Sequence, residues 1–299
     1  MSGASRRLLL RGAATLIGAA SLGLRAQRPV PRIVASFSIL ADMARELTPA
    51  GFDVSALVGP NADAHVFEPT PAHGRRLAQA DLVVVNGLGF EGWIDRLVKV
   101  SGTQAPIVVA SQGITPRQGG QHGADPHAWQ DLTLARRYAL TLSAGFAQRW
   151  PAQQAELKTR LDDYLARLAQ LDQQVRSGLG VIPRAQRRVI TSHDAFGYFG
   201  DAYGVDFLAP QGWATNSEPS AAAVARLIRQ IRQQQARALF VENISDPRLI
   251  ARIAQESGAQ VGGTLFSDAL SAPGGPADTY LKLFAHNSRS LAMALAAPR

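Results

Sequence analysis

The sequence predicts an α/β protein of two lobes, each a mostly parallel four-stranded sheet flanked by helices, joined by one long helix. Short apolar runs of strand length alternate with amphipathic segments near both ends of the chain. This alternation is typical of parallel sheets covered by helices on both faces. Between the two regions, Asp131 to Gly180 contains no strand-like run and has a helical pattern throughout. The 299 residues are enough for two such lobes.

Residues 27–150 form the predicted N-terminal lobe, and residues 181–299 the predicted C-terminal lobe. Each contains four short runs that are apolar enough to be buried strands. In the first lobe these are Arg32–Phe37, Asp53–Gly59, Asp81–Gly87 and Pro106–Ser111. In the second they are Arg187–Ser192, Asp206–Gly212, Ala238–Asn243 and Gln260–Phe266. Helical patterns separate most of the strands, and another helical pattern closes the chain.

The predicted linking helix comprises residues 151–180. A preceding helix ends before Pro151, and proline suits the first turn of the next helix. Apolar residues then recur every three or four positions along one stripe: Leu157, Leu161, Leu165, Leu168, Leu171, Val175 and Leu179. At 1.5 Å per residue this helix would span roughly 43 Å, which exceeds the width of one small domain. We therefore expect it to connect the two lobes.

Residues 1–26 have the pattern of a cleavable export signal. Arg6, Arg7 and Arg11 precede an apolar stretch and a small residue, Ala26, and the segment contains no acid. "SRRLLLR" resembles the twin-arginine export pattern, with an ordinary secretion signal as the alternative. We therefore expect a periplasmic protein, a location where proteins of this size are more often binding proteins or hydrolases than metabolic enzymes.

Composition excludes several classes of site. The chain has no cysteine, which rules out disulfides, thiolate metal ligands, a cysteine nucleophile and acylation at a cysteine. The formal charge is +8, and cleavage near Ala26 would lower it to about +4 by removing four arginines. The remaining arginines are dispersed and not interleaved with aromatic residues, so we expect no nucleic-acid partner.

Four side chains of the types that can bind metals lie just after predicted strands or after the loops that follow those strands. His65, His127, His193 and Asp268 each have this placement, two in each lobe. Because ligands bind outside the carboxyl ends of parallel strands, the four side chains could converge. Three imidazoles and one carboxylate make a full ligand set for a divalent ion. Singly, each histidine could equally be a solvated loop residue, and Asp268 a turn cap. We expect His73, His122 and His286 to lie outside the site.

The segments around these residues resemble the zinc- and manganese-binding solute-binding proteins of ABC importers, and the resemblance spans the mature chain. The four ligand loops of that family match "GPNADAHVFEPTP", "DPHAWQD", "TSHDAFGYFGDAYG" and "GTLFSDALS" in order. "PQGWATNSEPS" and "ALFVEN" are also similar to the second lobe of the family. The resemblance implies a metal held between two lobes, with His65, His127, His193 and Asp268 at the ligand positions.

The resemblance also implies a function without chemistry on the substrate: capture of a metal ion and its delivery to an ABC permease. Zn²⁺ suits three imidazoles and a carboxylate, whereas manganese-type members usually carry a carboxylate where this chain has His193. Mn²⁺ or Fe²⁺ is the alternative cargo, and "RQGGQHGAD" is much shorter than the His-rich insert of many zinc-binding members.

We expect a monomer, with peripheral contact to its membrane transporter and a possible periplasmic metallochaperone as a further partner. Metal affinity should fall below about pH 6, because histidines protonate near pH 6.5.

Three neighbouring residues have open roles. Glu68 follows His65 by three positions and could be a metal ligand, although we expect it to accept hydrogen bonds from the backbone or from a ligand side chain. Asp194 and Glu242 could orient imidazoles or act as structural caps. We expect Trp129 to contribute packing.

Other classes of function have weaker support. "GLGFEG" fits a dinucleotide-binding glycine pattern, but no acid follows about twenty residues later and it follows the third strand. A zinc-dependent hydrolase would keep an open coordination position, which Asp268 would fill. A structural extracellular protein would hold its metal permanently, whereas a transport protein must release it.

Overall fold

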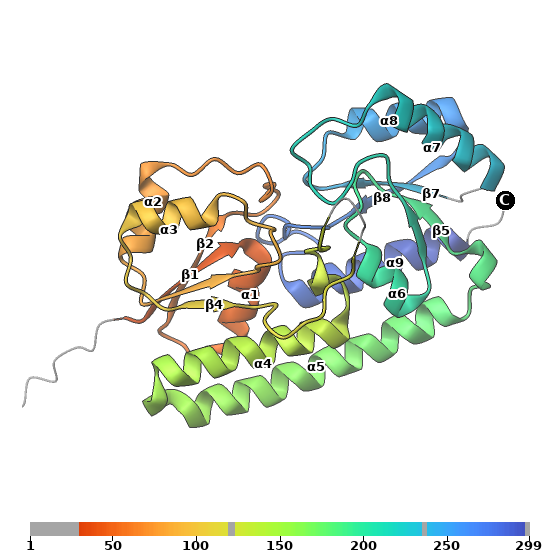
Figure 1. Ribbon diagram of the computed structural model, residues 1–299. Coiled ribbons are helices and arrows are strands. Elements are labelled where there is room, and N and C mark those ends of the chain that lie inside the picture. The colour runs from red at the N-terminus through yellow and green to blue at the C-terminus, as the bar shows by residue number, and fades with distance from the viewer. Residues whose placement is uncertain (1–29, 119–122, 235–237, 297–299) are drawn as a thin grey trace, which may run out of the picture.

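A computed structural model of the chain describes residues 30–118, 123–234 and 238–296. Within these residues the strands form two four-stranded sheets, ordered β2-β1-β3-β4 and β6-β5-β7-β8. Every pairing between neighbouring strands is parallel. Figure 1 shows the sheets in two lobes that lie side by side, with one long helix running beneath both. The predicted fold class is confirmed.

The eight predicted strands are all present in the described chain, and most are shorter than predicted. The N-terminal lobe is built on β1 (Arg32–Phe37), β2 (Asp53–Val58), β3 (Leu82–Val85) and β4 (Ile107–Val109). The C-terminal lobe is built on β5 (Arg188–Ile190), β6 (Asp206–Leu208), β7 (Ala238–Glu242) and β8 (Gln260–Leu265). β6 ends two residues before Pro210, a residue that has no N–H to donate to a neighbouring strand. The predicted strand Asp206–Gly212 was therefore too long.

Helices cover both faces of each sheet. In the first half of the chain they are α1 (Ser38–Leu47), α2 (Pro71–Ala78), α3 (Ile94–Ser101) and α4 (Leu132–Arg149). They continue with α5 (Gln154–Gly180), α6 (Gly197–Tyr203), α7 (Ala221–Gln234), α8 (Pro247–Ser257) and α9 (Tyr280–Ala296). Pro151 lies in a short 3₁₀ turn, η3 (Pro151–Gln153), that leads directly into α5. Its position at the start of the second helix agrees with its preset φ angle.

The long helix α5 runs beneath both lobes (Figure 1). Its 27 residues span roughly 40 Å at 1.5 Å per residue. One stripe is buried, namely Leu157, Tyr164, Leu168, Leu171, Val175 and Leu179. Leu161 and Leu165, which were predicted to belong to this stripe, are only partly buried. The domain boundaries at residues 150 and 180 remain predictions, and the predicted signal and His122 lie outside the described residues.

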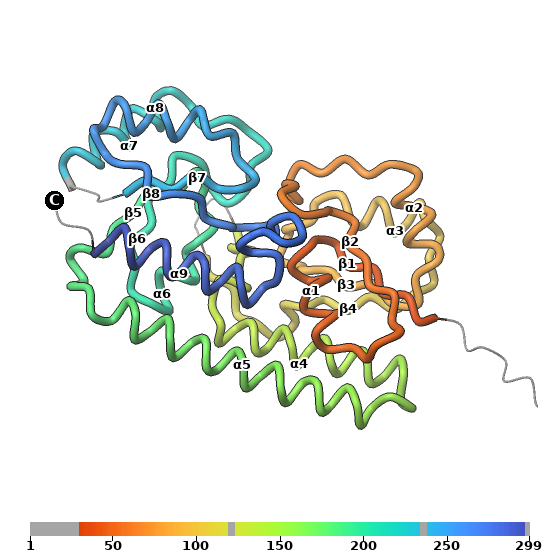
Figure 2. Tube along the Cα trace, turned by 180° about the vertical axis from the view of Figure 1, so that it is seen from behind, coloured from red at the N-terminus to blue at the C-terminus, as the bar shows by residue number. Residues whose placement is uncertain are grey.

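One hydrophobic core continues from the first lobe into the second. It contains the inner faces of both sheets together with apolar residues of α1, α4, α5, α6 and α9. Figure 2 shows α9 lying along α5 at the back of the molecule. Two smaller clusters fill the outer faces, one between the first sheet and α2 and α3, the other between the second sheet and α7 and α8. The shared inner core fixes the two sheets relative to each other.

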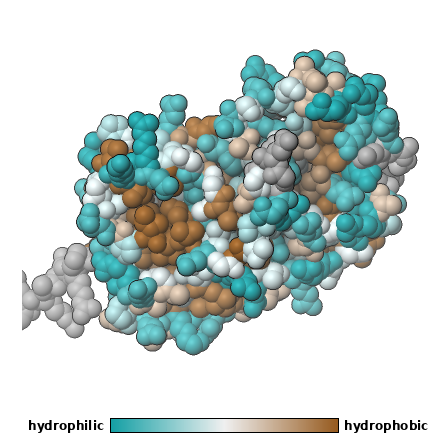
Figure 3. Space-filling model, in the orientation of Figure 1, coloured by the Kyte–Doolittle hydropathy of each residue, from teal (hydrophilic) through white to brown (hydrophobic). Residues whose placement is uncertain are grey.

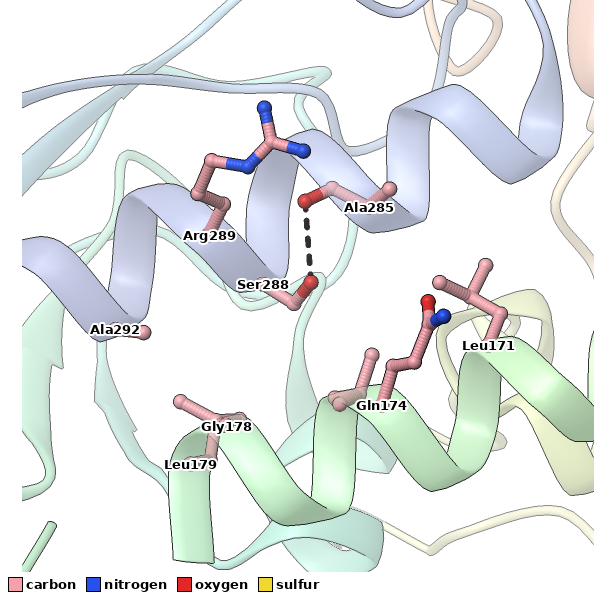
Figure 4. A pocket seen from close by; sticks show the side chains of 9 residues that line it. Leu171, Gln174, Gly178, Leu179, Ala285, Ser288, Arg289 and Ala292 are labelled. Atoms are coloured by element: carbon pink, nitrogen blue, oxygen red, sulfur yellow. Dashed lines mark hydrogen bonds between the residues drawn. The ribbon is translucent and has the colours of Figure 1, made fainter. Parts of the chain in front are cut away.

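Two surface features lie away from this inner core. A hollow of about 280 Å³ lies between α5 and α9, lined by Leu171, Val175, Ala285 and Arg289 among others (Figure 4). Figure 3 shows apolar surface gathered over the strands of the N-terminal lobe, whose edge strand β4 carries the exposed Ile107. Among the described residues, no helix combines the length and apolar character that crossing a membrane requires.

Candidate metal centre

The four side chains singled out in the sequence meet between the two sheets. His65 lies in the loop after β2, His193 and Asp268 lie three residues beyond β5 and β8, and His127 precedes a 3₁₀ turn, η2 (Ala128–Gln130). Each offers one ligand atom, and these atoms all lie within 4.8 Å of one another. The expected convergence is therefore present, with two side chains from each lobe.

Asp268 lies at the centre of the cluster. Its Oδ2 is 3.2 Å from Nε2 of His65 and 3.2 Å from Nε2 of His193, and its Oδ1 is 3.7 Å from Nε2 of His127. All five atoms are buried, and none has a hydrogen-bond partner of good geometry within the described residues. Buried polar atoms without partners are rare because each carries a desolvation cost. Their convergence at one point fits a divalent cation, which would satisfy all of them together.

The His65 loop is held by several hydrogen bonds. The backbone N–H of His65 donates to Oδ1 of Asp63 at 2.8 Å, and the indole of Trp93 donates to the carbonyl of Ala64 at 2.7 Å. Asn61 adopts a left-handed conformation with φ of 53°, which asparagine tolerates better than most residues. Pro71 begins α2 at the end of the loop. These contacts fix an irregular segment and direct its imidazole into the centre.

His127 is oriented by a carboxylate that lies two residues earlier. Nδ1 of His127 donates to Oδ1 of Asp125 at 2.8 Å, which leaves the lone pair of Nε2 free to bind a metal. The same oxygen accepts the backbone N–H of His127 at 3.0 Å. The amide of Asn86 donates to the carbonyl of Pro126, and Tyr138 donates to Asn86. Both His127 and Asp125 are fully buried, so this imidazole is held in one orientation.

His193 has its own buried carboxylate. Nδ1 of His193 lies 2.6 Å from Oε2 of Glu242, and the backbone N–H of His193 donates to Oε1 at 2.8 Å. Glu242 is the last residue of β7, the strand next to β5. Of the two roles considered for Glu242 from the sequence, orienting an imidazole is supported by its direct contact with His193.

Asp268 is held through the residues on either side of it. The carbonyl of Ser267 accepts from the indole of Trp129 at 2.9 Å and from the amide of Gln130 at 2.8 Å. The backbone N–H of Leu270 donates to Oγ of Ser38 at 3.0 Å. These contacts join the loop after β8 to the N-terminal lobe. The Trp129 ring also packs against Phe37 and Phe90 and is fully buried, as expected for a packing residue.

Burial and charge act against each other in this cluster. Burial lowers the pKa of His127, but Asp268 and Asp125 outweigh that effect and raise it from 6.5 to about 9. Burial also lowers the pKa of His193, whereas Glu242 and Asp268 hold it well above its ordinary value. Burial raises the pKa of Asp268, and His127 and His193 hold it well below its usual range. Without metal, the cluster therefore retains protons near neutral pH that a bound cation must displace.

Other residues considered from the sequence lie outside the cluster. Glu68 is exposed, and Asp194 accepts a hydrogen bond from the indole of Trp213 at 3.1 Å rather than from an imidazole. His73 accepts the backbone N–H of Thr70 at 2.9 Å, and His286 contacts the carbonyl of Thr264 at 3.1 Å. His73 and His286 are therefore outside the site, as predicted.

Sequence reasoning missed Asp125 and Asp63. Asp125 lies two residues before His127 and Asp63 two residues before His65, and both accept the backbone N–H of their histidine. An aspartate that bonds the N–H two residues later forms an Asx turn, so this repeated spacing was the signal available in the sequence.

The chain is similar to proteins named for three different metals. It is 31% identical over 258 residues to the iron-binding protein YfeA of Yersinia pestis, covering 84% of this chain and 82% of the relative. It is 29% identical over 258 residues to the manganese-binding lipoprotein MntA of Halalkalibacterium halodurans, covering 86% and 85%. Among solved structures, the periplasmic zinc binding protein TroA from Treponema pallidum matches with a TM-score of 0.86 at 28% identity. That match covers 89% of this chain and 99% of TroA.

A two-lobed fold with a buried three-histidine, one-aspartate cluster, together with these relatives, defines a metal-binding substrate-binding protein of an ABC transporter. The chain belongs to the family described as ZnuA, zinc-uptake complex component A, periplasmic, which matches residues 33–294. The predicted resemblance is thereby confirmed. This family works with the permease components of ABC transporters.

Proposed function

We propose that this protein captures Zn²⁺ as cargo through His65, His127, His193 and Asp268 and delivers it to an ABC permease. The observation that carries the proposal is the convergence of three imidazole Nε2 atoms and one carboxylate without good hydrogen bonds of their own. Such a set provides four ligands at one point, and a tetrahedral ion satisfies all four. The protein then acts by binding and release.

The donor atoms favour zinc over the other candidate ions. Three nitrogens and one carboxylate suit Zn²⁺, whereas Mn²⁺ prefers more oxygen and lies low in the Irving–Williams order. Relatives named for manganese, iron and zinc are all similar to this chain, so similarity alone does not choose among them. Mn²⁺ or Fe²⁺ bound at the same four side chains is the alternative cargo.

A hydrolase is the alternative from another class, and the donor set argues against it. A catalytic zinc ion keeps a coordination position for water, and Asp268 would occupy that position here. We therefore propose that the protein is not an enzyme. We further propose a monomer that acts in the periplasm after export by the segment 1–26, with a metallochaperone as a possible second partner.

Elemental analysis of the purified mature protein tests the proposal directly. We expect one zinc ion per chain in the wild type, and loss of zinc in the alanine variants of His65, His127, His193 and Asp268. His286→Ala is the matched control because His286 lies on α9 outside the cluster. Full zinc occupancy in two or more of the four alanine variants would contradict the site. Turnover of a peptide, ester or phosphoester that disappears in His193→Ala would contradict the transport function.

His193→Asp tests the choice of metal. The substitution replaces a nitrogen donor with oxygen at the position where manganese-type members carry a carboxylate, so the ratio of Zn²⁺ to Mn²⁺ affinity should fall. Competition titration of the wild type and the variant with both ions measures that ratio. A wild type that binds Mn²⁺ or Fe²⁺ in preference to Zn²⁺ under equal competition would replace zinc with the alternative cargo.

A further inference from the structure

Arg117 contacts carboxylates from both lobes. It lies in the long connection between β4 and α4, outside regular secondary structure. Its Nη1 donates to Oδ2 of Asp125 at 2.7 Å, and its Nε donates to Oδ2 of Asp201 at 2.7 Å. Asp125 belongs to the chain segment of the N-terminal lobe, whereas Asp201 lies on α6 of the C-terminal lobe. One planar guanidinium therefore bridges the lobes.

The contact with Asp125 leads directly to a proposed metal ligand. Asp125 is fully buried, and it uses one oxygen for each neighbour: Oδ1 for His127 and Oδ2 for Arg117. A buried carboxylate needs such partners because its desolvation is costly. The orientation of Asp125, and hence of the His127 imidazole, therefore depends on where the guanidinium lies.

The surface of α6 is shaped to receive this guanidinium. A Cβ atom added to Gly197 would lie 1.7 Å from Nη1 of Arg117, so a larger residue there would displace the arginine. The ring of Tyr198 lies beneath the guanidinium, with 5.6 Å from Cζ to the ring centroid. The Tyr198 hydroxyl accepts the backbone N–H of Arg117 at 3.0 Å and donates to the carbonyl of Asp125 at 2.9 Å. Gly197, Tyr198 and Asp201 thus hold Arg117 from the second lobe.

We propose that Arg117 is a positioning residue that couples the His127 imidazole to α6 of the opposite lobe. The proposal deepens the proposed function and rests on it, because it assigns Arg117 a role in retaining the metal ion. The path runs from the exposed Asp201 through Arg117 and Asp125 to His127, with every link at 2.7 or 2.8 Å. A displacement of α6 relative to the first lobe would shift this path and loosen one ligand. Metal retention is thereby coupled to the position of α6 against the N-terminal lobe.

The rate of zinc release tests the proposal. Zn²⁺ is loaded onto the mature protein and its dissociation is followed by stopped-flow mixing with a chromogenic chelator. Arg117→Met should accelerate release about 10- to 100-fold, the usual effect of removing an outer-shell partner. Asp201→Asn breaks only the link to α6 and should accelerate release about two- to fivefold, as expected for one exposed ion pair. Arg117→Lys should recover part of the loss, since lysine supplies charge without the planar fork.

The double variant distinguishes coupling from independent effects. If Asp201 acts through Arg117, Asp201→Asn should have no further effect in the Arg117→Met background. Arg252→Met is the matched control, since it breaks an arginine–carboxylate pair with Glu256 on the exposed face of α8. The visible spectrum of the Co²⁺-loaded protein reports ligand geometry. It should change in Arg117→Met and stay unchanged in Arg252→Met.

Two outcomes would overturn the proposal. Release from Arg117→Met within twofold of the wild type would remove the positioning role. If Arg117→Met folds poorly, release from Asp201→Asn at the wild-type rate would remove it instead. An undiminished effect of Asp201→Asn in the Arg117→Met background would remove the coupling. A wild type that binds no metal would instead contradict the proposed function, so the two failures are distinguishable.

Discussion

Glu242 contacts both the backbone and the imidazole of His193, with Oε1 2.8 Å from the backbone nitrogen and Oε2 2.6 Å from Nδ1. Both residues are fully buried. The carboxylate beside Nδ1 favours that atom as the site of the proton in the neutral imidazole, and Nε2 faces Asp268 at 3.2 Å. It also raises the basicity of the imidazole, as a carboxylate behind a metal-binding histidine usually does.

Replacing Glu242 by glutamine should weaken metal binding. The amide keeps the volume and one acceptor of the side chain but removes the charge that supports the His193 imidazole. We expect zinc affinity to fall about 10- to 100-fold, measured by competition with a chelator of known affinity. Glu256→Gln, which removes an exposed carboxylate on α8, should leave the affinity unchanged. Equal affinities for wild type and Glu242→Gln would show that Glu242 serves only to cap the His193 backbone.

Thr215→Val should accelerate metal release. The Thr215 hydroxyl donates to Oδ2 of Asp63 at 2.5 Å, and Oδ1 of the same carboxylate accepts the N–H of His65. Valine keeps the shape but leaves the partly buried carboxylate oxygen without this donor. The loss of about 0.5–1.5 kcal/mol for one hydrogen bond corresponds to a rate increase of about two- to tenfold. Stopped-flow dissociation of zinc measures the rate, with Thr159→Val on the surface of α5 as the matched control. An unchanged release rate would show that the His65 loop does not depend on this contact.

Zinc affinity should increase with pH through the neutral range. The expected fall in affinity below about pH 6 rests on the ordinary histidine pKa near 6.5, and the raised pKa of His127 moves the expected fall to higher pH. Burial lowers the pKa of His127, but Asp268 and Asp125 raise it to about 9, so a proton must leave when metal binds. We expect the affinity to rise up to about tenfold per pH unit between pH 7 and 9 for each proton displaced. Calorimetric titration in buffers of different ionisation enthalpy counts the released protons, and zero release at pH 7.5 would contradict this pKa.

The His127 imidazole should also make the stability of the metal-free protein depend on pH. A histidine whose folded pKa exceeds its unfolded value stabilises the fold fully below about pH 6.5 and loses that contribution as pH rises through about 9. We therefore expect the free energy of unfolding without metal to fall by a few kcal/mol over that interval. Zinc-saturated protein should lack this decline. Urea denaturation of both forms at several pH values checks the difference, and parallel pH profiles would contradict it.

Asp42 provides a second pH dependence, away from the metal cluster. Burial raises its pKa from 3.8 to about 6, although the backbone N–H of Tyr280 donates to its Oδ2 at 2.7 Å. A raised carboxylate pKa means that the folded state binds more protons than the unfolded state. The contribution of Asp42 to the free energy of unfolding therefore falls as pH rises from about 4 to 6. Asp42→Asn removes the titration. The wild type should lose up to about 3 kcal/mol relative to this variant across the interval, measured by urea denaturation of the metal-free protein.

The matched control for that experiment is Asp162→Asn, which alters an exposed carboxylate on α5. Its pH profile should follow the wild type. If Asp42→Asn also follows the wild type, Asp42 is ionised in the folded protein throughout the range.

The fold could be predicted because parallel strands buried on both faces are continuous apolar runs, and eight such runs were visible. The four cluster residues could be predicted from their places after strands or strand-end loops, since parallel topology brings such ends together. Strand ends were less predictable, as β6 shows, because Ala209 and Pro210 continue the apolar run although regular pairing ends at Leu208, with only an isolated bridge between His193 and Gln211 beyond it.

Contacts between segments that are far apart in the sequence could not be predicted. Arg117 and Asp201 are 84 positions apart, and Asp63 and Thr215 are 152 positions apart. Arg117, Asp63 and Thr215 lie in loops, and the position of Asp201 on α6 does not indicate which loop of the other lobe it contacts. For Asp194 the sequence left open whether the side chain orients an imidazole or acts as a structural cap, and its contact with the Trp213 indole agrees with a structural role.

The hydrophobic core that passes through α1, α5 and α9 into both lobes limits how the cargo can leave. Swinging the halves widely apart would expose part of that core to water at about 25 cal/mol for each Å² of apolar surface. Short excursions of the segments around His65 and His193 expose only the few core residues beside them, such as Ala64 and Ala195. We therefore expect unloading at the membrane to proceed by small shifts of these segments while the body of the molecule stays intact, and heat denaturation to occur as a single cooperative transition.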